Sequence, residues 1–169
     1  LSVQIQPNGG KWWRLRYRFD GKAKMLSLGV YPDVGLKDAR ERREEARKLL
    51  AAGVDPGENR KAHKAAKADR AANSFEVICR EWLEQRKDTV EPAQTAKTLA
   101  RMEKDVFPWI GGKAITDISA PDVLSVMRRM DERGARYTAH RVRSEISRAF
   151  RYAIATGRAE RDPCPDLRG

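Results

Sequence analysis

The sequence is short of cysteine and of long apolar runs, and both shortages narrow the classes of protein to which it could belong. Its two cysteines, Cys79 and Cys164, lie far apart, and neither has a second thiol or a histidine at metal-ligand spacing. We therefore expect no disulfide framework, no metal and no cofactor. No segment approaches the ~20 apolar residues of a membrane-spanning helix, and the N-terminus lacks the apolar core of a signal peptide. We expect a soluble, cytoplasmic protein without membrane contact.

Acidic residues are also in short supply. The chain has 24 Asp and Glu against 35 Lys and Arg, which leaves a net charge of +11 and a pI near 10.0. Such an excess of cations is typical of proteins that bind a polyanion. Nucleic-acid-binding, ribosomal and membrane-surface proteins share this balance, and so does a basic protein that is merely soluble. The placement of the charge along the chain must decide between them.

The first part of the chain predicts a small α+β domain over residues 1–54. Residues 2–6, 11–19 and 22–29 have the composition of strands and are separated by turn residues, which indicates a three-stranded antiparallel sheet. Residues 36–52 place their alanines and leucines on one helical stripe, and Gly53 ends this helix. One helix would then cover one face of the sheet.

The remainder of the chain predicts an all-α domain behind a linker. Residues 55–72 contain no large apolar residue and predict a charged linker with partial helical character. Residues 73–160 predict four helices, the first capped by Asn73 and the others over about 92–107, 119–133 and 138–156. Helices of this length favour a compact four-helix bundle.

The middle strand carries its charge on one face. By period-2 alternation, the face turned away from the predicted helix holds Trp12, Arg14, Arg16 and Arg18. Three arginines in a row repel one another unless an anion lies against them, and a β-ribbon fits the major groove of DNA. The alternative is a solvated face with arginine side chains lying on Trp12. We favour DNA, because outer faces usually mix charges of both signs.

The predicted helices carry further basic stripes. On the second helix the polar positions at spacings of three and four are Gln94, Lys97, Arg101 and Lys104. On the fourth helix the side chains expected opposite the core are Arg141, Ser144, Arg148, Arg151 and Tyr152. The third helix ends in Arg128, Arg129 and Arg133, which its dipole alone would explain. A solvated face explains each helix by itself, but three such faces in one small domain favour phosphate binding.

One short motif resembles a catalytic one. His140 and Arg143 fit an H-x-x-R pattern in which histidine and arginine hold a phosphate that a tyrosine attacks. On the predicted helix, however, Arg143 turns toward the core edge, and Tyr152 lies about two and a half turns away. No second arginine and lysine complete the arrangement. We therefore expect no catalytic residue in this chain.

Several segments together are recognisable. In the first half they are residues 9–22 (GGKWWRLRYRFDGK), 26–32 (LSLGVYP), 39–40 (AR) and 53–56 (GVDP). In the second half they are residues 105–111 (DVFPWIG), 118–121 (ISAP), 150–153 (FRYA) and 156–158 (TGR). The chain resembles, over nearly its whole length, the N-terminal part of the phage integrase family of tyrosine recombinases.

The resemblance implies a division of labour. Residues 1–54 would be an arm-type DNA-binding domain that lacks its usual preceding segment, and residues 73–160 a SAM-like core-binding domain. Residues 161–169 would begin the connection to a catalytic domain that is absent from this chain. Asp162 departs from the family pattern, which usually has Asn before the proline. The implied partners are double-stranded attachment-site DNA and other integrase protomers.

The resemblance and the charge pattern together name two sets of DNA-binding residues. For arm DNA they are Trp12, Arg14, Arg16, Arg18, Lys22 and Lys24. For core DNA they are Lys97, Arg101, Lys104, Arg141, Ser144 and Arg148. Two other interpretations stay open: a stand-alone regulator or prophage remnant without recombinase activity, and an RNA-binding protein. The second lacks the exposed aromatic platform that RNA-binding proteins commonly use.

Overall fold

The computed structural model describes residues 1–167, and the chain divides into two compact units, Leu1–Ala66 and Lys67–Gly169. The first unit contains the strands β1 (Ser2–Ile5), β2 (Lys11–Phe19) and β3 (Lys22–Tyr31) and the helix α1 (Leu36–Ala51). The strands form an antiparallel sheet in the order β1-β2-β3. The predicted α+β fold is confirmed.

At two positions in the sheet the backbone conformation explains which residues the sequence has there. Asp20 and Gly21 join β2 to β3 with φ values of 47° and 74°, the left-handed pair that a two-residue hairpin requires. Gly29 lies next to a register shift in the β2–β3 pairing and has a φ of 136°. A Cβ atom at this position would lie 2.3 Å from Cγ2 of Val34, so only glycine lets the following loop pack here.

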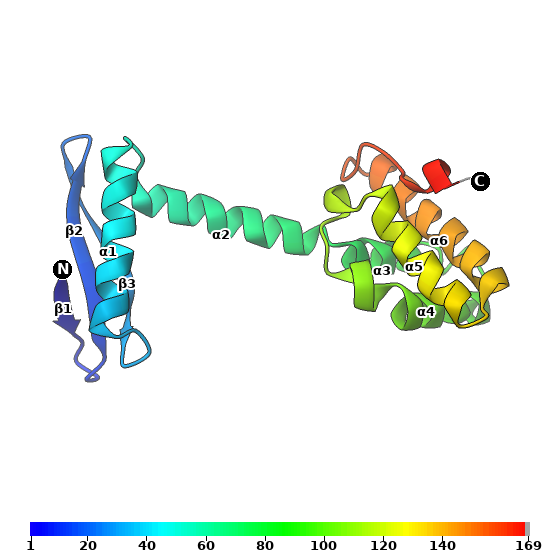
Figure 1. The fold of residues 1–169 in the computed structure, drawn as a ribbon, viewed down its shortest axis with the longest axis horizontal. Helices are drawn as coiled ribbons and strands as arrows, with labels where there is room; N and C mark the ends of the chain where they lie inside the picture. Colours follow the sequence, from blue (N-terminus) through cyan, green and yellow to red (C-terminus); the bar gives the residue numbers. More distant parts are fainter. Residues whose placement is uncertain (168–169) are drawn as a thin grey trace. The chain divides into compact units, whose positions relative to one another are not determined.

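Helix α1 covers one face of the sheet (Figure 1). Leu15, Leu28 and Ala46 form the small core between helix and sheet. The indole nitrogen of Trp13, on the same face of β2, donates a hydrogen bond to the carbonyl oxygen of Val34 over 2.8 Å. The other face of β2, which carries the arginines, has no element of residues 1–66 packed on it.

Helix α2 (Pro56–Ala72) occupies the segment predicted as a charged linker. Its helical residues are mostly exposed, which fits their composition, but its first turn is attached to the sheet through Asp55. Asp55 is 6% exposed and accepts hydrogen bonds from the Tyr17 hydroxyl and the Gly57 amide, while Lys24 forms an ion pair with it. The segment 55–57 therefore belongs structurally to the first unit.

The second unit packs its main helices around one apolar core. They are α3 (Phe75–Gln85), α4 (Pro92–Asp105), α5 (Ala120–Glu132) and α6 (Arg136–Ala155). Short turns of helix lie at Phe107–Gly111, Ile115–Asp117 and Cys164–Leu167. Phe75 is fully buried, with its ring centroid 6.3 Å from that of Phe107 and 5.9 Å from that of Phe150.

The ends of these helices differ slightly from the predicted ones. Ser74, not Asn73, precedes the first residue of α3, because the carbonyl of Asn73 accepts a hydrogen bond from the Ile115 amide. Helix α4 ends at Asp105, since Pro108 follows and the chain widens into the π-helical turn Phe107–Gly111. The Ser119 cap of α5 is confirmed, with the Asp122 carboxylate accepting from the Ser119 amide.

Two further observations complete the fold. Among residues 1–167, no helix combines the length and the apolar character needed to cross a bilayer. Arg168 and Gly169, at the end of the segment predicted to lead toward a catalytic domain, lie outside the described residues.

Candidate nucleic-acid interface

The sheet brings the predicted arm residues of β2 together on the face that α1 leaves open. Cross-strand pairing places Ser27, Met25 and Ala23 of β3 beside Arg14, Arg16 and Arg18, and Ser2 and Gln4 of β1 beside Arg14 and Trp12. We call this surface the arginine face. It contains three guanidinium groups and no carboxylate, so its charge is of one sign.

The arginines of this face differ in their surroundings. Arg14 donates from Nε to Oε1 of Gln4 over 3.1 Å, and its guanidinium lies over the Trp12 ring at 5.1 Å. The stacking on Trp12 that a solvated face predicts is therefore present, but for Arg14 alone. Arg16 and Arg18 are exposed and have no hydrogen-bond or ion-pair partner within residues 1–167. These two cations are free to bind an anion.

Lys22 and Lys24 do not join the arginine face. They pair across the strands with Phe19 and Tyr17, so they lie on the face that α1 covers. Lys24 forms the ion pair with Asp55, whose carboxylate raises the pKa of this lysine. Alternation along β3 therefore places these lysines on the face opposite the arginines, and Lys24 helps to attach α2 to the sheet.

In the second unit, α4 and α6 line a shallow groove with polar and cationic walls. Its residues include Gln94, Tyr137, His140, Arg141, Ser144 and Arg148. Arg141, Ser144 and Arg148 are exposed at spacings of three and four, as the sequence predicts. Tyr137, 81% exposed, was not among the predicted residues. Its place one turn before Arg141 on the same stripe is the signal that would have identified it.

Arg101 occupies a different position from the one predicted. Its guanidinium donates from Nη2 and Nε to the carboxylate of Glu145, which is 4% exposed, and from Nη2 to Thr98 Oγ1 over 3.1 Å. The arginine side chain is only 18% exposed. Arg101 therefore neutralises a buried carboxylate beneath the groove, whereas Lys97 and Lys104 of the same helix are exposed.

Tyr152 was predicted on the open side of α6, and this prediction is wrong. It packs against the core, and its hydroxyl donates to Oε1 of Glu81 over 2.6 Å. Arg158 donates two further hydrogen bonds to the same carboxylate, and this interaction lowers the pKa of Glu81. The three side chains bind one another and so hold the loop after α6 against α3.

The two residues of the H-x-x-R motif lie in different environments. His140 is exposed at the groove, whereas Arg143 donates from Nη1 to the carbonyl oxygen of Leu167 over 2.9 Å. Arg143 thus holds the turn Cys164–Leu167 against α6. The inward position predicted for Arg143 is confirmed.

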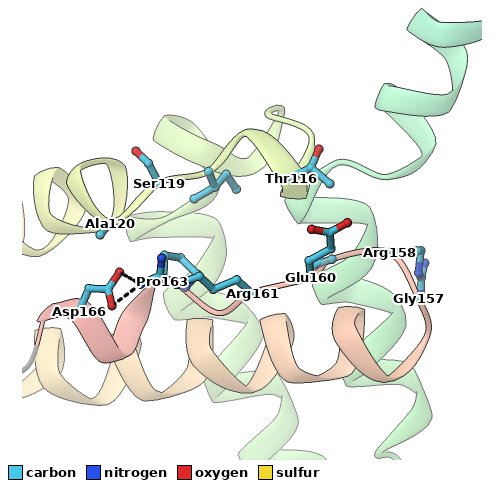
Figure 2. A pocket seen from close by; sticks show the side chains of 11 residues that line it. Thr116, Ser119, Ala120, Gly157, Arg158, Glu160, Arg161, Pro163 and Asp166 are labelled. Atoms are coloured by element: carbon cyan, nitrogen blue, oxygen red, sulfur yellow. Dashed lines mark hydrogen bonds and ion pairs between the residues drawn. The ribbon is translucent and has the colours of Figure 1, made fainter.

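An open cleft lies between the segment 116–120 and the segment 157–166 (Figure 2). Its arginines are already paired: Arg161 binds both oxygens of Asp166 at 2.6 and 2.7 Å, and Arg158 binds Glu81. Glu160 adds a negative charge at the rim. This cleft is therefore a poor match for a polyanion compared with the arginine face and the α4–α6 groove.

Comparison with known proteins agrees with the two-unit architecture. Residues 75–169 match the family described as phage integrase central domain, and residues 1–63 match the arm DNA-binding domain. Prophage integrase IntS of Escherichia coli K12 is 40% identical over 167 residues, which are 99% of this chain and 42% of IntS. The integrase of Shigella phage Sf6 is 39% identical, over 99% of this chain and 42% of that protein.

A solved structure is similar to part of the chain. An NMR structure of a fragment of IntS of E. coli is 40% identical, covers 57% of this chain and 81% of the fragment, and has a TM-score of 0.53. This chain spans less than half the length of the integrases that it matches.

Proposed function

Because the chain belongs to the phage integrase family, we propose that it recognises the attachment-site DNA of a prophage through two surfaces, one on each unit. The arginine face of the sheet binds arm-type sites, and the α4–α6 groove binds the core-type site. The observation that carries this proposal is the open arginine face. It has two guanidinium groups without a partner among residues 1–167, inside the segment that matches an arm DNA-binding domain.

Trp12, Arg14, Arg16 and Arg18 make the arm contacts. Arg16 and Arg18 reach bases or phosphates directly, because nothing in the first unit competes for them. Arg14 is held by Gln4 and Trp12, which orders its guanidinium before DNA arrives. Lys22 and Lys24 contribute only to the general positive field.

The core contacts come from exposed residues of α4 and α6. Lys97, Lys104, Arg141 and Arg148 bind phosphates, and Ser144 lies between the two arginines of α6 as a small residue that lets the helix approach closely. Arg101 supports this surface by its pair with Glu145.

The whole protein would be a tyrosine recombinase that integrates and excises a prophage, acting in the cytoplasm with other protomers on DNA. IntS and the Sf6 protein, both named integrases, support this assignment. Within this chain the proposed divisions are 1–54 for arm DNA, 55–72 as a connector whose residues 55–57 are fixed to the first unit, and 73–160 for core DNA, with 161–169 leading toward the catalytic domain.

The test is selection of binding sites from a random duplex pool with residues 1–169, followed by affinity measurement at several salt concentrations. With ~6 phosphate contacts we expect about a 10³-fold loss of affinity between 50 and 200 mM salt. An RNA duplex of the selected sequence should bind more weakly. Binding that ignores salt, or that prefers RNA, would contradict the proposal.

A further inference from the structure

Met25 lies in the middle of the arginine face. It pairs across the strands with Arg16, and Ala23 and Ser27 flank it on the same side of β3. Its side chain is 53% exposed. A large apolar side chain that stays in water beside unpaired guanidinium groups adds nothing to phosphate binding, so its position calls for a different contact.

The surface around Met25 is shaped as a ridge between two shallow hollows. One hollow is lined by residues of β1 together with Arg14, Arg16 and Met25, and the other by Arg16, Arg18, Ala23 and Met25 among others. Arg16 and Met25 line both hollows, so the two side chains form the boundary between them. Side chains on such a ridge are open to a groove of DNA laid against this face.

The chemistry of the DNA major groove offers one apolar group to such a ridge, the C5-methyl group of thymine. Methionine suits this contact because its thioether chain is flexible and polarizable and adapts to the methyl group without a fixed geometry. Arg16 beside it has the donors that guanine accepts on its major-groove edge. An apolar side chain and a cation side by side would thus distinguish a thymine next to a guanine from other base steps.

We propose that Met25 is a specificity-determining residue that contacts the methyl group of one thymine in the arm site. This inference rests on the proposed binding of duplex DNA by the arginine face. It assigns to β3 a part in reading the sequence, whereas the charge pattern places the contacts on β2.

The experiment removes single methyl groups from the DNA. A duplex selected from a random pool by residues 1–169 is prepared with one thymine at a time replaced by deoxyuridine, and affinities are measured by fluorescence anisotropy. At one position the wild-type protein should lose about 3- to 4-fold in affinity, the effect of one buried methyl group. The Met25→Ala variant should bind the thymine duplex and the deoxyuridine duplex of that position with equal affinity. The Met25→Leu variant should keep the wild-type difference in affinity.

The matched control is Ile5→Ala. Ile5 is 69% exposed on the same sheet but pairs with Lys11 on the opposite face, so this variant should keep the wild-type response at every thymine. Retention of the full response by Met25→Ala, or a wild-type protein that is insensitive at all thymines, would overturn the inference and leave DNA binding intact. Failure of the pool to yield any bound duplex would instead contradict the proposed function, and the inference with it.

Discussion

The hydroxyl group of Tyr17 donates a hydrogen bond to Oδ1 of Asp55 over 2.6 Å, and so joins the middle strand to the residue that precedes α2. Asp55 also pairs with Lys24 and accepts from the Gly57 amide, and these contacts hold its pKa well below the usual range. Burial, followed by the hydrogen bond to Asp55, raises the pKa of Tyr17. The conspicuous Asp55-Pro56-Gly57 segment is thus a structural attachment on the covered face of the sheet.

Asp55→Asn should lower the melting temperature at pH 7 and make it less dependent on pH in acid. The folded pKa of Asp55 is depressed, so its stabilising effect is complete above the unfolded pKa of about 3.9, declines below that pH, and is lost only as pH falls through the folded pKa. In thermal melts between pH 7 and pH 2.5, the difference in melting temperature between wild type and variant should therefore narrow below about pH 4. Parallel curves over this range would show that the Asp55 charge is not what stabilises the attachment.

Arg16→Ala should weaken binding to the selected arm duplex and reduce the slope of log affinity against log salt by about 1. Lys22→Ala removes the same charge from the opposite face of the sheet and serves as the matched control. Anisotropy titrations at four salt concentrations give both quantities. Equal effects of the two substitutions would indicate that net charge, and not the arginine face, determines the affinity.

The second unit alone, residues 67–169, should bind a core-site duplex in a salt-sensitive manner. Independent folding of this unit is expected, because the structure of the IntS fragment was determined apart from the rest of IntS. Arg141→Ala and Arg148→Ala should each weaken this binding, whereas Arg161→Ala should not, since Arg161 is already paired with Asp166. If Arg161→Ala reduced the affinity as much as Arg148→Ala, the α4–α6 groove would not be the binding surface.

Arg101→Ala should destabilise the second unit by about 3–5 kcal/mol, because it leaves the buried carboxylate of Glu145 without its partner. Replacing both residues, as in Arg101→Met with Glu145→Leu, should recover much of this loss, since apolar residues of similar volume pack in the same space. Urea denaturation of Arg101→Met, Glu145→Leu and the double variant measures the coupling. Additive losses would mean that the two side chains do not act as a pair.

The sequence predicts much of this molecule because the relevant signals are local. Strand alternation places Arg14, Arg16 and Arg18 together, the Asp20-Gly21 pair marks the hairpin, and Ser119 caps its helix as expected. The exposed stripe of Arg141, Ser144 and Arg148 follows in the same way from helical spacing. Each of these features depends on neighbours within a few residues along the chain.

Periodicity could not predict the hydrogen-bond and ion-pair partners that lie far apart in the sequence. Lys24 and Asp55 are 31 positions apart, Arg101 and Glu145 are 44 apart, and Tyr152 meets Glu81 across 71 positions. The sequence alone does not distinguish a Lys or Arg that is free to bind DNA from one that neutralises a buried carboxylate. The amino-acid sequence by itself determined the two basic units and the arginine face, because these rest on composition and local period, and its motifs carried the resemblance to the family. Only the tertiary structure decided which cations are free for DNA, because a buried carboxylate takes up a cation wherever the packing of strands and helices brings the two together.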